Sequence, residues 1–110
     1  MRIYIAGPIA GKADGNKPAF AEAAERVRGA GHQPVNPWDI PPDHEGVCCP
    51  GEPTEHEPDS GHTYGCYLRA DILWLVYCDA IMLLDGWAQS KGASTEAHVA
   101  QSLGLPVVKF

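Results

Sequence analysis

The sequence predicts one α/β domain, a small three-layer Rossmann- or flavodoxin-like fold around a mainly parallel sheet of about four or five strands. The chain has 110 residues, which is the size of a single domain. Short apolar runs alternate with helix-period stripes in the order strand, helix, strand, long loop, helix, strand, helix, strand. Parallel strands joined by right-handed helical crossovers accommodate that order.

The first predicted strand covers residues 2–6 and runs into a loop bounded by Gly7 and Gly11. Glycine adopts backbone conformations that other residues resist, so the main chain of this loop can approach a ligand closely. An ordinary strand-to-helix turn would contain the same glycines, and both interpretations stay open here. In the helix that follows, Asn16 is the expected N-cap and Pro18 lies in the first turn. Its buried stripe consists of Phe20, Ala23, Ala24 and Val27, and it ends at Gly29 or Gly31.

A short second strand over residues 33–36 is stopped by Pro37, and an irregular excursion over residues 37–61 follows. The excursion holds most of the prolines and has no periodicity, which is typical of a functional or mobile loop. A zinc site is one interpretation of its histidines and cysteines, with the candidate ligands His44, Cys48, Cys49, His56, His62 and Cys66. Their spacing matches no zinc finger and contains no C-x-x-C, so we expect free thiols and no metal.

The second helix is predicted over residues 63–77 and carries one charge, Asp71, within its apolar stripe. The stripe consists of Tyr64, Tyr67, Leu68, Asp71, Ile72 and Leu75. A lone carboxylate buried on such a face is costly unless it is paired or hydrogen-bonded. Asp71 is therefore either a structural partner, for a loop or an arginine, or a functional group.

The stretch over residues 80–103 is the one around which the function is argued. A buried strand is expected over residues 80–84, then a turn-rich loop over residues 85–92, then a helix with Glu96 on its core-facing stripe. We expect Glu96 in the first turn of that helix, just past the carboxyl end of a strand, where open α/β sheets bind their ligands. A favourable interaction with the helix dipole is the simpler role for this glutamate. A last short strand is expected over residues 107–110.

Composition excludes several classes of function. The formal net charge of −6 and the lack of a basic stripe argue against a nucleic-acid or anionic-membrane binder. No apolar run approaches the ~20 residues of a membrane span, and the N-terminus does not resemble a signal peptide. We therefore expect a cytoplasmic protein.

Two carboxylates on core-facing stripes at one sheet edge suit the cleavage of a glycosidic bond. One carboxylate attacks the sugar carbon, and the other manages a proton at the leaving group from ~5–5.5 Å away. Glu96 is expected to be the ionised nucleophile, favoured by the helix N-terminus. Asp71 lies in a more apolar setting, where a raised pKa would let it act as the acid. Tyr4 on the first strand is placed to orient Glu96, although a strand tyrosine can also be plain packing.

Four segments resemble the superfamily of nucleoside 2-deoxyribosyltransferases and nucleoside 5′-monophosphate N-glycosidases, in particular a small bacterial and phage branch of it. They are IYIAGPIAG, RADILWLVYCDAIMLL, DGWAQSKGASTEAHVA and SLGLPV, and they leave mainly residues 37–61 outside the resemblance. The resemblance implies that Glu96 is the nucleophile, that Asp71 handles the sugar hydroxyl or the leaving base, and that Tyr4 positions the nucleophile. It also implies that no metal or cofactor is needed and that the protein is a homodimer or larger.

The resemblance also implies a substrate-binding set. Ser90 falls where the monophosphate hydrolases bind the 5′-phosphate through a serine. The residues expected to contact substrate are Gly7, Pro8, Ile9, Gly11, Ser90, Gly92 and Ala93. Pro8 and Ala10 differ from the polar residues that those hydrolases carry in the first loop, so the choice between nucleotide and nucleoside stays open.

The expected activity is cleavage of the N-glycosidic bond of a nucleoside 5′-monophosphate or deoxynucleoside, by hydrolysis or by transfer to another base. Two alternatives remain: a nucleotide sensor that binds without turnover, and a zinc-stabilised interaction module built on the excursion. A nucleotide panel with product analysis separates the enzyme from the sensor, and metal analysis tests the zinc module.

Overall fold

A computed structural model describes residues 1–40 and 62–110 of the chain. Its four-stranded sheet is parallel throughout and has the order β2-β1-β3-β4. The strands are β1 (Arg2–Ala6), β2 (Gln33–Val35), β3 (Ala80–Leu83) and β4 (Val107–Val108). The predicted α/β class and parallel sheet are therefore confirmed.

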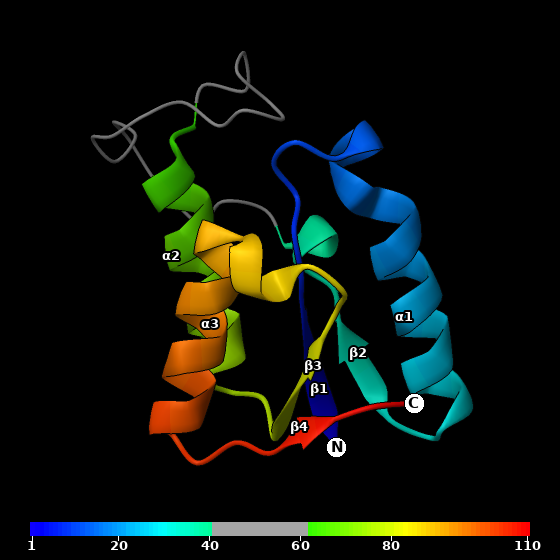
Figure 1. Cartoon of the computed structure of the whole chain (residues 1–110). Coiled ribbons are helices and arrows are strands. Elements are labelled where there is room, and N and C mark those ends of the chain that lie inside the picture. Colours follow the sequence, from blue (N-terminus) through cyan, green and yellow to red (C-terminus); the bar gives the residue numbers. More distant parts are fainter. Residues whose placement is uncertain (41–61) are drawn as a thin grey trace.

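Helices cover both faces of this sheet (Figure 1). Helix α1 (Lys17–Gly29) lies on one side, and α2 (Tyr64–Leu75) and α3 (Lys91–Ser102) lie together on the other. Within residues 1–40 and 62–110, short 3₁₀ helices lie in the connections at Ala13–Asn16, Pro37–Asp39 and Trp87–Gln89. The sheet thus forms the middle of three layers, as expected for strands that alternate with helices.

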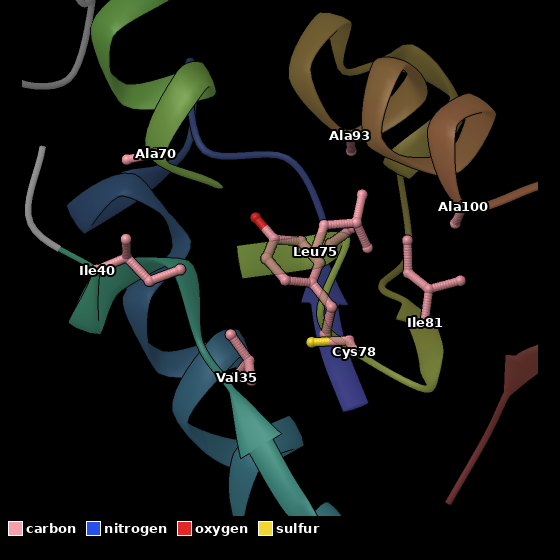
Figure 2. Close-up of a cluster of buried hydrophobic side chains, with 10 residues drawn as sticks. Val35, Ile40, Ala70, Leu75, Cys78, Ile81, Ala93 and Ala100 are labelled. Atoms are coloured by element: carbon pink, nitrogen blue, oxygen red, sulfur yellow. The ribbon is translucent and has the colours of Figure 1, made fainter. Parts of the chain in front are cut away.

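Two apolar clusters fill the space on either side of the sheet, because successive side chains of a strand point to opposite faces. Ile3 and Ile5 of β1 pack on the α1 side with Phe20 and Val27. Tyr4 and Ala6 point the other way, and their cluster is completed by Val35, Ile40, Ala70, Leu75, Cys78, Ile81, Ala93 and Ala100. Figure 2 shows this second cluster, with side chains from β2, β3, α2 and α3 converging on one centre.

The largest difference from prediction lies at the start of α3. This helix begins at Lys91, with Ser90 as its N-cap, so Glu96 lies in the second turn and not in the first. The hydroxyl oxygen of Ser90 accepts a hydrogen bond from the Ala93 N–H over 3.2 Å, which stabilises a helix start that includes Gly92, a residue of low helix propensity. Asn16 does occupy the N-cap position of α1, but its side-chain amide donates to the Pro8 carbonyl over 2.9 Å and caps nothing.

The predicted excursion over residues 37–61 is described only at its beginning, where Pro37–Asp39 forms a 3₁₀ turn capped by the Asn36 side chain. His44, Cys48, Cys49 and His56 lie outside the described residues. Among the residues that the structure does describe, no helix combines the length and apolar character needed to span a membrane.

Candidate active site

The candidate site lies at the edge of the sheet where β1 and β3 end. These two strands run side by side in parallel, with Tyr4 opposite Ile81. Their carboxyl ends therefore face the same way, toward the N-terminal halves of α2 and α3 (Figure 1). This is the edge at which open parallel sheets bind ligands.

Tyr4 and Glu96 form the centre of the site. The Tyr4 hydroxyl donates a hydrogen bond to Glu96 Oε2, joining the middle of β1 to the buried face of α3. Tyr4 is 0% exposed and Glu96 is 5% exposed, and Glu96 is the one charged residue among the buried residues of the described part of the chain. The predicted pairing of these two residues therefore exists in the structure.

Asp71 lies on α2, within electrostatic range of this pair. Burial and, to a smaller extent, the negative charge of Glu96 together raise the pKa of Asp71 to about 8. Glu96 has the lower pKa of the two and ionises first, so its negative charge opposes ionisation of the second carboxyl. The charge of Glu96 therefore reaches Asp71, and the convergence of the two carboxyls on one substrate stays a prediction.

The pKa of Glu96 differs from the sequence-based expectation. Burial raises it to about 7, and the hydrogen bond from Tyr4 opposes that rise. We expected the helix N-terminus to favour the ionised form, but the dipole effect fades beyond the first turn, and Glu96 lies in the second. Desolvation therefore outweighs the dipole, and Tyr4 is the group that favours the carboxylate.

Replacing Tyr4 by phenylalanine should raise the pKa of Glu96, because Tyr4→Phe keeps the buried ring and removes the hydrogen bond that stabilises the carboxylate. A rise of about one unit is expected for one bond to a charged group. Carbon-13 NMR of labelled glutamate measures it directly. Tyr77→Phe, at a tyrosine that is 73% exposed, is the control. An unchanged Glu96 titration would contradict the positioning role of Tyr4.

The two raised pKa values also make stability depend on pH. Between the ordinary carboxyl pKa and the raised values, the folded protein binds more protons than the unfolded chain, so the free energy of unfolding falls as pH rises. We expect Tm to drop between pH 5 and pH 9, by calorimetry. Asp71→Asn should reduce that drop and unfold at a higher Tm than the wild type at pH 9. Asp85→Asn, at an exposed position, should follow the wild-type curve; Asp71→Asn doing the same would contradict the burial of this carboxyl.

The loop over residues 7–11 meets the loop between β3 and α3 beside the site. A side chain at Gly86 would come within 3.3 Å of the Pro8 ring, so these two loops touch. A side chain at Gly7 would clash with Leu84 at 2.8 Å, which assigns Gly7 a packing role beside the expected contact with substrate. Gly11 has a φ of 77°, which a residue with a side chain rarely adopts.

The substrate-binding residues expected at the start of α3 already have contacts within the protein. Ser90 and Ala93 bond each other at the cap, and this leaves the Ser90 O–H as a donor. Gly92 lies against the Tyr64 hydroxyl, whose oxygen is 3.2 Å from the position that a Cβ atom at residue 92 would occupy.

The side chain of Ile9, in the loop after β1, packs with the α1-side cluster, on the face of the sheet opposite Glu96. Any contact of Ile9 with substrate would therefore come from its main chain.

No group of three or more potential ligands for a metal gathers within residues 1–40 and 62–110. Of the expected zinc ligands, His62 and Cys66 are described, and the Cys66 sulfur lies 3.6 Å from His62 Nδ1. The other four candidates fall outside the described residues, so the zinc interpretation stays a prediction.

Tyr64 is the residue whose place in the site the sequence did not reveal. Its position on the apolar stripe of α2 is typical of core packing, yet its hydroxyl is buried without a hydrogen-bond partner in the described structure. Both Glu96 and Asp71 raise its pKa, after burial as the main cause, which places it within reach of their charges. The seven-residue spacing from Asp71 was the available signal, because it puts both residues on one helix face.

A profile of the family described as "Domain of unknown function (DUF4406)" matches residues 1–109. The chain belongs to this family. The DUF4406 match includes Tyr4, Asp71 and Glu96, but its description assigns no activity to them. No curated protein and no solved structure matches the chain.

Proposed function

We propose that this protein cleaves the N-glycosidic bond of a nucleoside 5′-monophosphate or deoxynucleoside, by hydrolysis or by transfer of the sugar to another base. The single observation that carries the proposal is the buried Glu96, held by the Tyr4 hydroxyl and coupled to the carboxyl of Asp71. Two carboxyls whose environments separate their pKa values are the usual sign of a nucleophile and an acid. The resemblance of four sequence segments to nucleoside-cleaving enzymes supports the same reaction.

The proposed reaction begins with Glu96 as the carboxylate and Asp71 as the acid. A Glu96 oxygen attacks C1′ of the sugar, the C1′–N bond breaks, and the base leaves with the proton of Asp71. Water or a second base then attacks C1′ and releases Glu96. In that step Asp71, now ionised, accepts a proton from the attacking group. Each residue thus returns to its starting state.

Burial gives each group its proposed role at neutral pH. With a pKa of about 8, Asp71 keeps its proton at pH 7, as an acid must. Glu96, with a pKa of about 7, is about half ionised there, and the Tyr4 hydrogen bond favours the ionised half. Tyr4 itself stays protonated, because burial and the nearby carboxylates raise its pKa well above its usual value.

The substrate end of the site is proposed on the loops beside the carboxyls. The Ser90 O–H and the amide of Gly92 at the start of α3 suit a 5′-phosphate, since helix N-termini bind anions. Main-chain groups of residues 7–11 border the same edge, with Pro8 against Gly86. We propose a small-molecule substrate in the cytoplasm and no bound cofactor.

A homodimer or larger assembly is part of the proposal. Large apolar side chains are exposed at the C-terminal end of α2 and directly after it, namely Leu73, Trp74, Val76 and Tyr77. Contiguous exposed apolar residues of this size are typical of interaction surfaces. Light scattering of the purified protein measures the mass in solution, and a monomer at all concentrations would contradict this part.

The test of the proposed function is a panel of nucleoside monophosphates and nucleosides, incubated with the protein and analysed for free base. Each substrate is run with and without a second base, because a transferase produces a new nucleoside and a hydrolase produces free sugar. Release of base from at least one substrate is expected. A nucleotide that raises Tm but is never cleaved would contradict the enzyme and favour a sensor.

A further inference from the structure

Asn16 occupies the N-cap position of α1 without capping the helix. Its backbone is left-handed, with a φ of 65°, and its side chain makes no capping hydrogen bond. Asp14 and Gly15 before it are left-handed too, with φ values of 53° and 59°. A left-handed residue that carries a side chain is strained, and a missing cap is destabilising. Such features persist only where the surrounding structure fixes them, and they cluster at functional sites.

Two side chains hold this left-handed turn in place. The Asn16 amide donates a hydrogen bond to the Pro8 carbonyl over 2.9 Å. The Trp38 indole N–H donates to the Gly15 carbonyl over 3.1 Å, and its ring occupies the space that a Cβ atom at Gly15 would need. Trp38 therefore fixes the turn itself, whereas Asn16 connects the turn back to the end of β1. The bond from Asn16 closes the loop over residues 8–16 at its base.

The same bond fixes the direction of the peptide group between Pro8 and Ile9. The described residues contain no cis peptide bond, so the C=O and the N–H of this group point in opposite directions. The Pro8 carbonyl points to the start of α1, and the Ile9 N–H therefore points away from it. Helix α1 lies on the face of the sheet opposite α3 and Glu96 (Figure 1). The Ile9 N–H is thus turned toward the side of the sheet that carries the candidate site.

The Ile9 N–H is a donor without an acceptor in the protein. No hydrogen bond within the described residues uses it, whereas the Ile9 carbonyl accepts from the Lys12 N–H over 3.3 Å. The neighbouring Pro8 ring lies against Gly86, in the loop that joins β3 to α3 beside the carboxyls. The main chain of Ile9 is already an expected substrate contact, and Asn16 is the side chain that orients it.

We propose that Asn16 is a positioning residue of the candidate site, whose amide turns the Ile9 N–H toward an acceptor oxygen of the substrate. This rests on the proposed function, because the acceptor belongs to the same substrate. Asn16 itself contacts no substrate, and its hydrogen bond is separate from the one between Tyr4 and Glu96. Losing the amide should therefore weaken substrate binding and leave the chemical step largely unchanged.

The experiment compares Asn16→Gly with Asp14→Gly. Glycine adopts the left-handed conformation without strain, so both variants keep the turn, and only Asn16→Gly removes the hydrogen bond to Pro8. For a substrate found with the panel, Asn16→Gly should raise KM about tenfold and leave kcat within about twofold. Asp14→Gly, at an exposed residue of the same turn, should change neither.

Two further readouts distinguish positioning from plain stability. Relief of strain offsets the lost bond, so the Tm of Asn16→Gly should stay within about 4 °C of the wild type. Asn16→Asp keeps the shape of the side chain but cannot donate to a carbonyl as a carboxylate, so it should raise KM at least as much. An unchanged KM in Asn16→Gly, a larger fall in Tm, or an equal effect of Asp14→Gly would overturn the proposal.

Nuclear magnetic resonance of protein labelled with ¹⁵N-isoleucine separates this proposal from the proposed function. In protein carrying Glu96→Gln, which binds without turnover, ligand should shift the Ile9 amide proton downfield, and adding Asn16→Gly should abolish the shift. A shift that persists in Asn16→Gly overturns the role of Asn16 and leaves the enzyme standing. A shift that depends on Asn16, without base release by the wild type, overturns the reaction and supports the positioning. Failure of every compound in the panel to bind overturns both.

Discussion

Replacing Glu96 by alanine is expected to abolish base release, with a loss on the order of 10⁴-fold or more, as for other nucleophiles of covalent catalysis. The alanine removes the atom that attacks C1′, and it removes the carboxyl that accepts the hydrogen bond from the Tyr4 hydroxyl. Glu96→Gln keeps the shape and an acceptor for the Tyr4 hydroxyl but cannot attack, so it should be equally inactive. Free base is measured chromatographically under initial-rate conditions.

Two controls keep this result interpretable. Glu22→Ala removes an exposed glutamate of α1 that pairs with Arg26 over 3.4 Å, far from the site, and should retain full activity. The circular dichroism and Tm of Glu96→Gln should match those of a folded protein. Normal turnover by either Glu96 variant would remove the mechanism.

The second large effect is expected at Asp71. Because Glu96 must be ionised and Asp71 protonated, kcat/KM of the wild type should rise through about pH 7 and fall through about pH 8, a narrow bell whose limbs belong to the coupled pair. Asp71→Asn cannot supply the proton and should lose about 10²–10⁴-fold, together with the alkaline limb. The measurement is the pH–rate profile of both proteins.

The leaving group provides the control for this assignment. A substrate whose base departs readily as an anion needs no acid, so Asp71→Asn should cleave it at nearly the wild-type rate. Asp85→Asn, at an exposed carboxylate, should behave as wild type with every substrate. If Asp71→Asn loses the same factor with good and poor leaving groups, Asp71 does not act as the acid.

Most of the fold follows from local patterns. The strand at Arg2–Ala6 and the helix at Lys17–Gly29 coincide with the prediction, because a short buried run predicts the first, and a helical stripe with a terminal glycine predicts the second. The start of α3 differs from the prediction, because Gly92 has a low helix propensity and the Ser90 cap fixes the boundary before it. The last strand is shorter than expected, at Val107–Val108.

The sequence indicated which residues to expect in the candidate site, but it did not indicate the pKa values of their side chains. Glu96 and Asp71 stand out in sequence because each is a single charge on an apolar stripe, and Tyr4 because strand and helix meet at one edge. The rise in the pKa of Glu96 depends on how deeply α3 packs on β1, which is a property of the folded chain. The buried, unpaired hydroxyl of Tyr64 likewise depends on three-dimensional neighbours, which the sequence pattern does not reveal.

The central claim is that Glu96 attacks the sugar, and trapping of the covalent intermediate tests it most directly. A nucleotide with fluorine at C2′ slows release of the sugar from the enzyme, so the adduct can be located by peptide mass spectrometry after digestion. The account predicts one added sugar phosphate on the peptide that contains Glu96, and none in Glu96→Gln. Base release that continues without an adduct, or an adduct on a different peptide, would contradict it.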